Sequence, residues 1–186
     1  EDIALMRTIP GMTVIVPSDD IEAKAAVKAA AAMEGPVYMR FGRLAVPVIN
    51  DEDYKFEIGK GNVLKEGTDV IANGLCVAES LEAAKKLEAE GINAQVINMA
   101  TVKPLDTELV LKAAKETGKV VTVEEHSVIG GLGSAVCDVL SEQLPTPVLK
   151  IGVNDVFGHS GPAVELIKEF GLDGDSIAAK VKEFVK

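Results

Sequence analysis

Apolar residues in the first 46 positions follow two different spacings. Residues 12–17 form a short, β-branched apolar run that predicts a strand buried on both faces. Asp19 and Glu22 then stand at capping-box spacing ahead of a helix. Its apolar face is expected from the positions that repeat at helical intervals, Ala23, Val27, Ala30 and Ala31. A second strand should follow this helix at residues 37–41. Another helix is expected at the start of the chain, over the first seven residues.

A second alternation of strand and helix patterns begins near residue 58. Strands are expected near 70–72, 94–98, 120–124 and 148–151, with helices between them and an amphipathic helix at the end of the chain. Strands separated by helices predict an α/β fold with a mostly parallel sheet and helices on both faces.

The domain organisation follows from a change in composition. The acidic, polar stretch at residues 50–57 is typical of a linker that crosses the surface. Residues 1–50 contain too few strands to close a sheet of their own. We therefore expect residues 1–50 to be the tail of one α/β domain, 51–58 to be a linker, and 59–186 to be a second, complete domain. A helix that starts at Glu1 without a cap or an initiating Met leads us to expect missing upstream chain.

Composition excludes several classes of protein. The 186 residues carry 29 acidic and 19 basic side chains, so the net charge of -10 argues against a nucleic-acid partner. No apolar run approaches the roughly 20 residues of a membrane span, and no signal segment opens the sequence. Cys76 and Cys137 lack CxxC spacing, which favours core packing over zinc or a disulfide. We expect a cytoplasmic protein without membrane partners.

Two features near residue 130 suggest chemistry only weakly. The glycine-rich stretch at residues 129–135 follows a strand and opens a helix, where backbone N–H groups can face an anion. Its spacing is not GxGxxG, so strand-to-helix packing is the favoured interpretation. Glu124, Glu125 and His126 resemble an acid–base cluster, but neighbouring side chains of a strand point to opposite faces, so the two carboxylates should not converge.

Two further segments carry polar candidates. Arg40 and Arg43 lie at the end of a strand, where either guanidinium could bind a phosphate; pairing with acidic residues of the linker is an equally good interpretation. In the segment 154–161, Ser160 is expected to cap the next helix, and His159 to be a surface or interface residue.

Three segments resemble the C-terminal portion of transketolase, and in particular the C-terminal subunit of split transketolases. They are residues 1–19 (EDIALMRTIPGMTVIVPSD), 123–135 (VEEHSVIGGLGSA) and 152–161 (GVNDVFGHSG). The resemblance covers the whole chain. It implies that residues 1–50 are the end of the thiamine pyrimidine-binding domain and that 59–186 are the transketolase C-terminal domain.

The resemblance also implies a function. Transketolases transfer a two-carbon ketol unit between sugar phosphates, using thiamine diphosphate and Mg or Ca. The family's catalytic glutamate and histidines precede the segment where this chain begins, so the resemblance implies no catalytic, cofactor or metal residue here. Arg43, four residues before Pro47, resembles the arginine that binds the substrate phosphate, although Gly42 and Leu44 replace the Ser and Gln of many full-length members. The implied partners are an N-terminal transketolase subunit and a second copy of this chain.

Related enzymes share this domain order. The alternatives are 1-deoxyxylulose-5-phosphate synthase and the β subunit of 2-oxo acid dehydrogenases, over which residues 43–47 and 157–161 favour transketolase. An alternative of another class is a noncatalytic assembly module. On either view, this chain alone is expected to be inactive and mainly structural and dimer-forming.

Overall fold

The central element is a five-stranded, mostly parallel sheet. The computed structural model describes residues 1–67, 70–72, 74 and 76–186. Strand order in the sheet is β3 (Asn62–Lys65), β5 (Val96–Asn98), β4 (Val70–Ala72), β7 (Val120–Ser127) and β8 (Val148–Val153). Strands β5, β4, β7 and β8 run parallel to one another, whereas β3 is antiparallel to β5. The four parallel strands confirm those expected from the sequence; β3 was not predicted.

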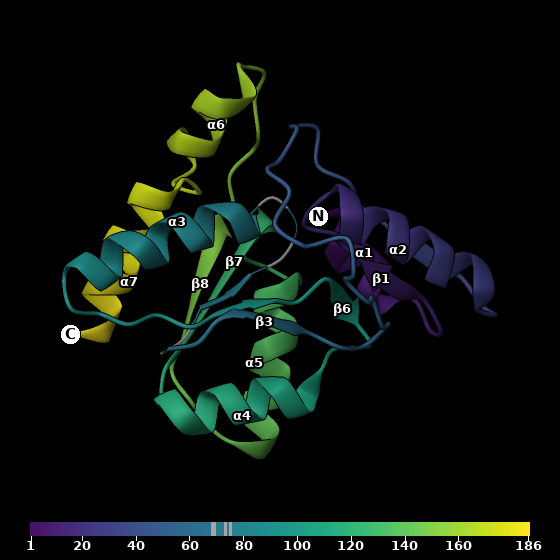
Figure 1. Cartoon of the computed structure of the whole chain (residues 1–186), viewed down its shortest axis with the longest axis horizontal. Helices are drawn as coiled ribbons and strands as arrows, with labels where there is room; N and C mark the ends of the chain where they lie inside the picture. The colour runs from purple at the N-terminus through teal and green to yellow at the C-terminus, as the bar shows by residue number, and fades with distance from the viewer. Residues whose placement is uncertain (68–69, 73, 75) are drawn as a thin grey trace.

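Helices cover both faces of this sheet. On one face lie α3 (Cys76–Ala89) and α7 (Gly174–Val185), and on the other α4 (Thr107–Thr117) and α5 (Leu132–Gln143) (Figure 1). Alternate strand residues point to opposite faces, so Val120 packs with the α4 and α5 residues while Val121 packs with those of α3 and α7. This arrangement confirms the predicted α/β fold.

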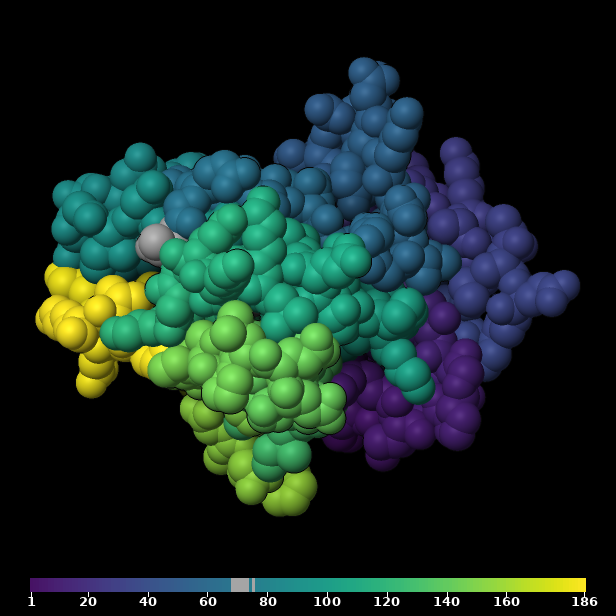
Figure 2. Space-filling model, turned by 90° about the horizontal axis from the view of Figure 1, so that it is seen from below, coloured from purple at the N-terminus to yellow at the C-terminus, as the bar shows by residue number. Residues whose placement is uncertain are grey.

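The N-terminal region contributes two strands to a second, smaller sheet. Its elements are α1 (Asp2–Thr8), β1 (Thr13–Ile15), α2 (Asp20–Ala32) and β2 (Val37–Met39). β1 pairs in parallel with β2 and antiparallel with β6 (Thr101–Lys103), a strand that the sequence pattern did not predict. A strand from the later part of the chain therefore completes the small sheet. In the space-filling view the purple N-terminal residues lie against the green residues of the later part (Figure 2).

Two local predictions were wrong. In α2 the buried residues are Glu22 and Ala26, whereas Val27 and Ala31 of the expected apolar face are exposed, because only one narrow edge of this helix packs on the protein. Helix α6 (Ala163–Glu169) has Pro162 at its N-cap and no side-chain cap, so Ser160 lies too early in the chain to cap it. Within the described residues, no helix is both long enough and apolar enough to cross a membrane.

Candidate functional site

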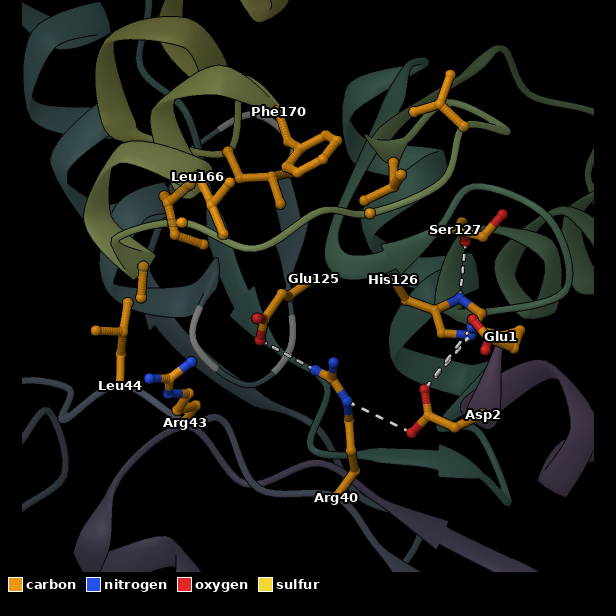
Figure 3. Close-up of a pocket in the computed structure, with 17 residues that line it drawn as sticks. Glu1, Asp2, Arg40, Arg43, Leu44, Glu125, His126, Ser127, Leu166 and Phe170 are labelled. Carbon is orange, nitrogen blue, oxygen red and sulfur yellow. Dashed lines mark hydrogen bonds and ion pairs between the residues drawn. The ribbon is translucent and has the colours of Figure 1, made fainter.

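A pocket of about 370 Å³ lies where the N-terminal elements meet the C-terminal domain. One wall is charged and the other is apolar (Figure 3). The charged wall comes from α1, the chain after β2 and the end of β7, with Asp2, Arg40, Arg43 and Glu125. The apolar wall comes from β8, α6 and the segments beside them, with Val153, Val156, Leu166, Ile167, Phe170 and Leu172. Such a pocket combines charge for an ionic ligand with a wall that excludes water.

Arg40 is held by two carboxylates from different elements. Its Nη1 lies 3.1 Å from Glu125 Oε2, and its Nε lies 3.5 Å from Asp2 Oδ2 (Figure 3). The Tyr38 hydroxyl also donates to Asp2 Oδ2, at 2.6 Å. Burial would raise the pKa of Asp2, but the Tyr38 hydrogen bond and the Arg40 charge outweigh it and hold that pKa below its usual range. Arg40 therefore ties β2 to α1 and β7, and its charge is already balanced.

Arg43 differs from Arg40 although both line the same pocket. It lies in the exposed segment after β2, beside Leu44 (Figure 3). Among the described residues its guanidinium has no hydrogen bond and no ion pair, with the linker or with any other segment. An arginine that is charged, exposed and unpaired can bind a phosphate bidentately without first breaking a contact. The two arginines, equivalent in the sequence pattern, thus have different surroundings.

Glu124 lies on the opposite side of β7 from Glu125, so the two carboxylates diverge as the strand periodicity predicted. It is fully buried, and its oxygens accept the Leu132 N–H at 2.7 Å and the Gly133 N–H at 2.8 Å. Burial raises the pKa of Glu124, against the effect of these two hydrogen bonds. The backbone N–H groups at the start of α5, which could in principle face an anion, are therefore bound by a carboxylate of this chain.

The same stretch is the docking surface of α1. A Cβ at Gly130 would come within 2.5 Å of the Ala4 Cβ, and Arg7 Nη1 donates to the Gly130 carbonyl at 2.6 Å. His126 has a buried side chain whose Nε2 accepts the Ala4 N–H at 3.4 Å while Nδ1 donates to the Ser127 carbonyl at 2.8 Å. Both ring nitrogens of His126 thus make structural hydrogen bonds, although His126 also lines the pocket, where its Nε2 lies 3.9 Å from Asp2 Oδ1 (Figure 3).

A second buried polar cluster joins the N-terminal segment to the linker and the main sheet. Glu22 accepts hydrogen bonds from the Ser18 hydroxyl at 2.7 Å, the Tyr54 hydroxyl at 2.6 Å and the Asn98 amide at 2.8 Å. Burial and the neighbouring Glu22 raise the pKa of Tyr54. The capping-box spacing located Glu22, but the contacts with Tyr54 and Asn98 had no signal in the sequence because those residues lie far along the chain.

The remaining candidates show no ligand site of their own. His159 is exposed and its Nε2 lies 2.9 Å from Glu169 Oε1, a hydrogen bond that raises the pKa of His159. Both cysteines are free thiols, and burial raises the pKa of Cys76. In the described parts of the chain no three His, Cys, Asp or Glu side chains are grouped to hold a metal ion. Because Glu124 accepts the N–H groups of Leu132 and Gly133, these two amides at the start of α5 are not free to bind a diphosphate.

Comparisons with known proteins agree over the whole chain. The transketolase pyrimidine-binding domain matches residues 1–48, and the transketolase C-terminal domain matches 59–177. The 6-deoxy-6-sulfo-D-fructose transketolase subunit of Clostridium sp. (strain MSTE9) is 46% identical over 98% of this chain and 58% of its own length. One subunit of the apulose-4-phosphate transketolase of Phocaeicola vulgatus is 44% identical over 100% of this chain and 60% of its own length.

A solved structure gives the same relationship in three dimensions. A split-gene transketolase, in an inactive β4 tetramer, superposes with a TM-score of 0.95 at 55% identity, over 98% of this chain and 61% of that one. The chain thus spans about three fifths of the length of its relatives. Because both domain matches, the close relatives and the shared fold agree, this chain belongs to the transketolase family.

Proposed function

We propose that this chain is part of a thiamine diphosphate-dependent transketolase that transfers a two-carbon ketol unit between sugar phosphates, and that Arg43 binds the phosphate of the substrate. The observation that carries the proposal is the difference between the two arginines of the pocket. Arg40 is neutralised by Asp2 and Glu125, while Arg43 has no partner among the described residues. An anionic group entering the pocket would therefore bind Arg43 first.

The relatives support an anionic substrate. One is named for 6-deoxy-6-sulfo-D-fructose and the other for apulose 4-phosphate, and each of these sugars carries a charged oxyanion group. A guanidinium can donate two parallel hydrogen bonds to either a phosphate or a sulfonate. We assign sugar phosphates to this chain, with the sulfonated sugars as the variant of the same chemistry.

The cofactor site is assigned to other parts of the assembly. The described residues offer neither three metal ligands nor free amides at the start of α5. Thiamine diphosphate and its Mg or Ca ion would therefore be held mainly by an N-terminal transketolase subunit. A second copy of this chain would complete the assembly; the β4 tetramer of the split-gene relative supports self-association. This chain would be mainly structural and dimer-forming, in a cytoplasmic enzyme, which its free thiols suit.

The test is an Arg43→Gln substitution in the complete enzyme, assembled with its partner subunit, thiamine diphosphate and magnesium. Xylulose 5-phosphate is the donor, and ribose 5-phosphate is compared with unphosphorylated glycolaldehyde as acceptor. A hydrogen-bonded charge pair contributes about 1.5–3 kcal/mol, so the KM for ribose 5-phosphate should rise by roughly 10–100-fold while glycolaldehyde is little affected.

Three results would contradict the proposal. An equal rise in KM for ribose 5-phosphate and for glycolaldehyde would show that Arg43 does not bind the phosphate. Turnover of pyruvate with glyceraldehyde 3-phosphate in place of ketol transfer would identify a 1-deoxyxylulose-5-phosphate synthase. An assembled complex that has normal stoichiometry but no turnover of either kind would favour the noncatalytic assembly module.

A further inference from the structure

Arg43 lies in a segment that few contacts hold. We call residues 41–48 the Arg43 strap. In the described part of the chain, no backbone N–H or carbonyl of the strap takes part in a hydrogen bond. Phe41 and Val48, two of its large apolar side chains, are more than half exposed. Neither hydrogen bonding nor close packing along the strap therefore fixes the position of Arg43.

Cavities border the strap on more than one side, in addition to the main pocket. One, of about 290 Å³, lies between the strap and the start of α2, and another, of about 360 Å³, lies between the strap and α3, α6 and the start of α7. A segment with open space around it loses the dispersion contacts that hold a packed loop. Its geometry must then be set at its two ends.

The end before the strap is an ordinary continuation of β2. The Arg40 N–H donates to the Ile15 carbonyl at 2.9 Å, and the Arg40 side chain is fixed by its two carboxylates. The other end depends on one side chain. Asp19 Oδ2 accepts the Ile49 N–H at 2.8 Å and the Asn50 N–H at 2.7 Å.

The Asp19 carboxylate is buried and both of its oxygens accept hydrogen bonds. Only 4% of the residue is exposed, and its other oxygen, Oδ1, accepts the Glu22 N–H at 2.8 Å as the N-cap of α2. Burial would raise the pKa of Asp19, but the backbone N–H groups of Asn50, Glu22 and Ile49 outweigh it and lower that pKa. The carboxylate therefore joins the start of a helix to the end of the strap, through three backbone N–H groups.

We propose that Asp19 is a positioning residue for Arg43: by fixing the far end of the strap, its carboxylate sets where the guanidinium lies in the pocket. This inference rests on the proposed phosphate-binding role of Arg43. With the anchor in place the strap is ordered before the ligand arrives. Without it, binding has to order the strap as well, and affinity for the anionic end of the substrate falls.

The chain offers variants that separate this role from others. Asp19→Asn keeps one oxygen to cap α2 but replaces the strap-facing acceptor with an NH2 group, which cannot accept the two N–H groups. Asp19→Ser likewise preserves a good helix cap without reaching the strap. Asp20→Asn is the matched control, because it removes the same charge one residue away from an exposed side chain that pairs with Lys24.

The first measurement is hydrogen exchange of the Ile49 and Asn50 amides in the complete enzyme. Both should exchange at least tenfold faster in Asp19→Asn and Asp19→Ser, and at the wild-type rate in Asp20→Asn. Unchanged exchange in both Asp19 variants, with folding confirmed by circular dichroism, would overturn the anchor.

The second measurement is steady-state kinetics with ribose 5-phosphate and glycolaldehyde as acceptors. Asp19→Asn should raise the KM for ribose 5-phosphate by about tenfold, because even a small displacement of the Arg43 guanidinium weakens its binding to the phosphate. The kcat and the KM for glycolaldehyde should stay within about twofold of wild type. The Asp19→Asn/Arg43→Gln double variant should be no worse than Arg43→Gln alone.

The outcomes separate the two proposals. If Arg43→Gln discriminates between the acceptors but Asp19→Asn does not, or if Asp19→Asn impairs both acceptors equally, the positioning role is wrong and the function of Arg43 stands. If Arg43→Gln itself fails to discriminate, the phosphate-binding function fails, and the positioning role fails with it.

Discussion

The α1 junction and the Arg43 strap lie on either side of Arg40 and are built in opposite ways. We use the name α1 junction for the contacts of α1 with β7 and the glycine-rich stretch. There, Arg40 and Glu124 each have two polar partners from other segments, and both ring nitrogens of His126 are hydrogen-bonded, one of them to the Ala4 N–H of α1. Three residues beyond Arg40, Arg43 has none among the described residues. The charged side chains of the junction thus have their partners within the protein, whereas the guanidinium of Arg43 has no hydrogen bond or ion pair with any described residue.

The contrast follows from electrostatics. A buried charge without a partner is strongly destabilising, so the junction charges are retained only with their hydrogen bonds complete. A guanidinium in the exposed strap keeps its hydration and needs no protein partner. Substitutions in the junction should therefore change stability, and substitutions in the strap should change ligand binding.

The largest expected effect is on a junction glycine. A Cβ at Gly131 would lie 2.0 Å from Glu124 Oε2, which cannot move without losing its hydrogen bonds to α5. Gly131→Ala should therefore reduce the free energy of unfolding by about 3 kcal/mol, measured by urea denaturation. Gly158→Ala is the matched control, because no atom lies within 4 Å of its added Cβ, and it should stay within about 0.5 kcal/mol of wild type. Equal unfolding midpoints for the two variants would contradict this account of the junction.

A smaller effect should separate the two arginines directly. Arg40→Gln leaves the half-buried Asp2 and Glu125 without their cation, so we expect a loss of about 1–2 kcal/mol in the free energy of unfolding. Arg43→Gln removes no hydrogen bond or ion pair between described residues and should change the free energy of unfolding by less than about 0.5 kcal/mol. Urea denaturation of the two variants under the same conditions measures the difference. An equal cost for both would mean that the junction and the strap do not differ as described.

The sequence predicted the main sheet well, and the reasons are local. Continuous apolar strands and amphipathic helices have periodicities that short windows reveal, as at residues 120–124. Strands β3 and β6 were not predicted. Both are short and pair antiparallel at a sheet edge, outside the regular alternation of strand and helix by which the equally short β4 and β5 were located. The exposed Val27 shows the converse error: a helical spacing of apolar residues does not reveal how wide a face is buried.

The site was predicted only in part. A position after a strand was enough to single out Arg40 and Arg43, but which of them is free depends on Asp2 and Glu125, which lie 38 and 85 residues from Arg40 along the chain. The glycine-rich stretch likewise has two possible roles until Glu124 is seen on its amides. Contacts of this length have no signature in the local sequence pattern.

The smallest expected effect concerns the pH dependence of the strap anchor. Backbone N–H groups hold the pKa of Asp19 below its ordinary value of 3.8, despite its burial. A carboxyl whose pKa is lower in the folded state contributes stability that is complete above the unfolded pKa and is lost as the pH falls through the folded value. Asp19→Asn cannot titrate, so wild type should exceed it in free energy of unfolding at neutral pH, and the difference should shrink as the pH falls below about 4. Urea denaturation of both proteins from neutral pH to about pH 3 measures this difference. A difference that stays constant or grows on acidification would show that the Asp19 carboxylate is not the group that holds the strap.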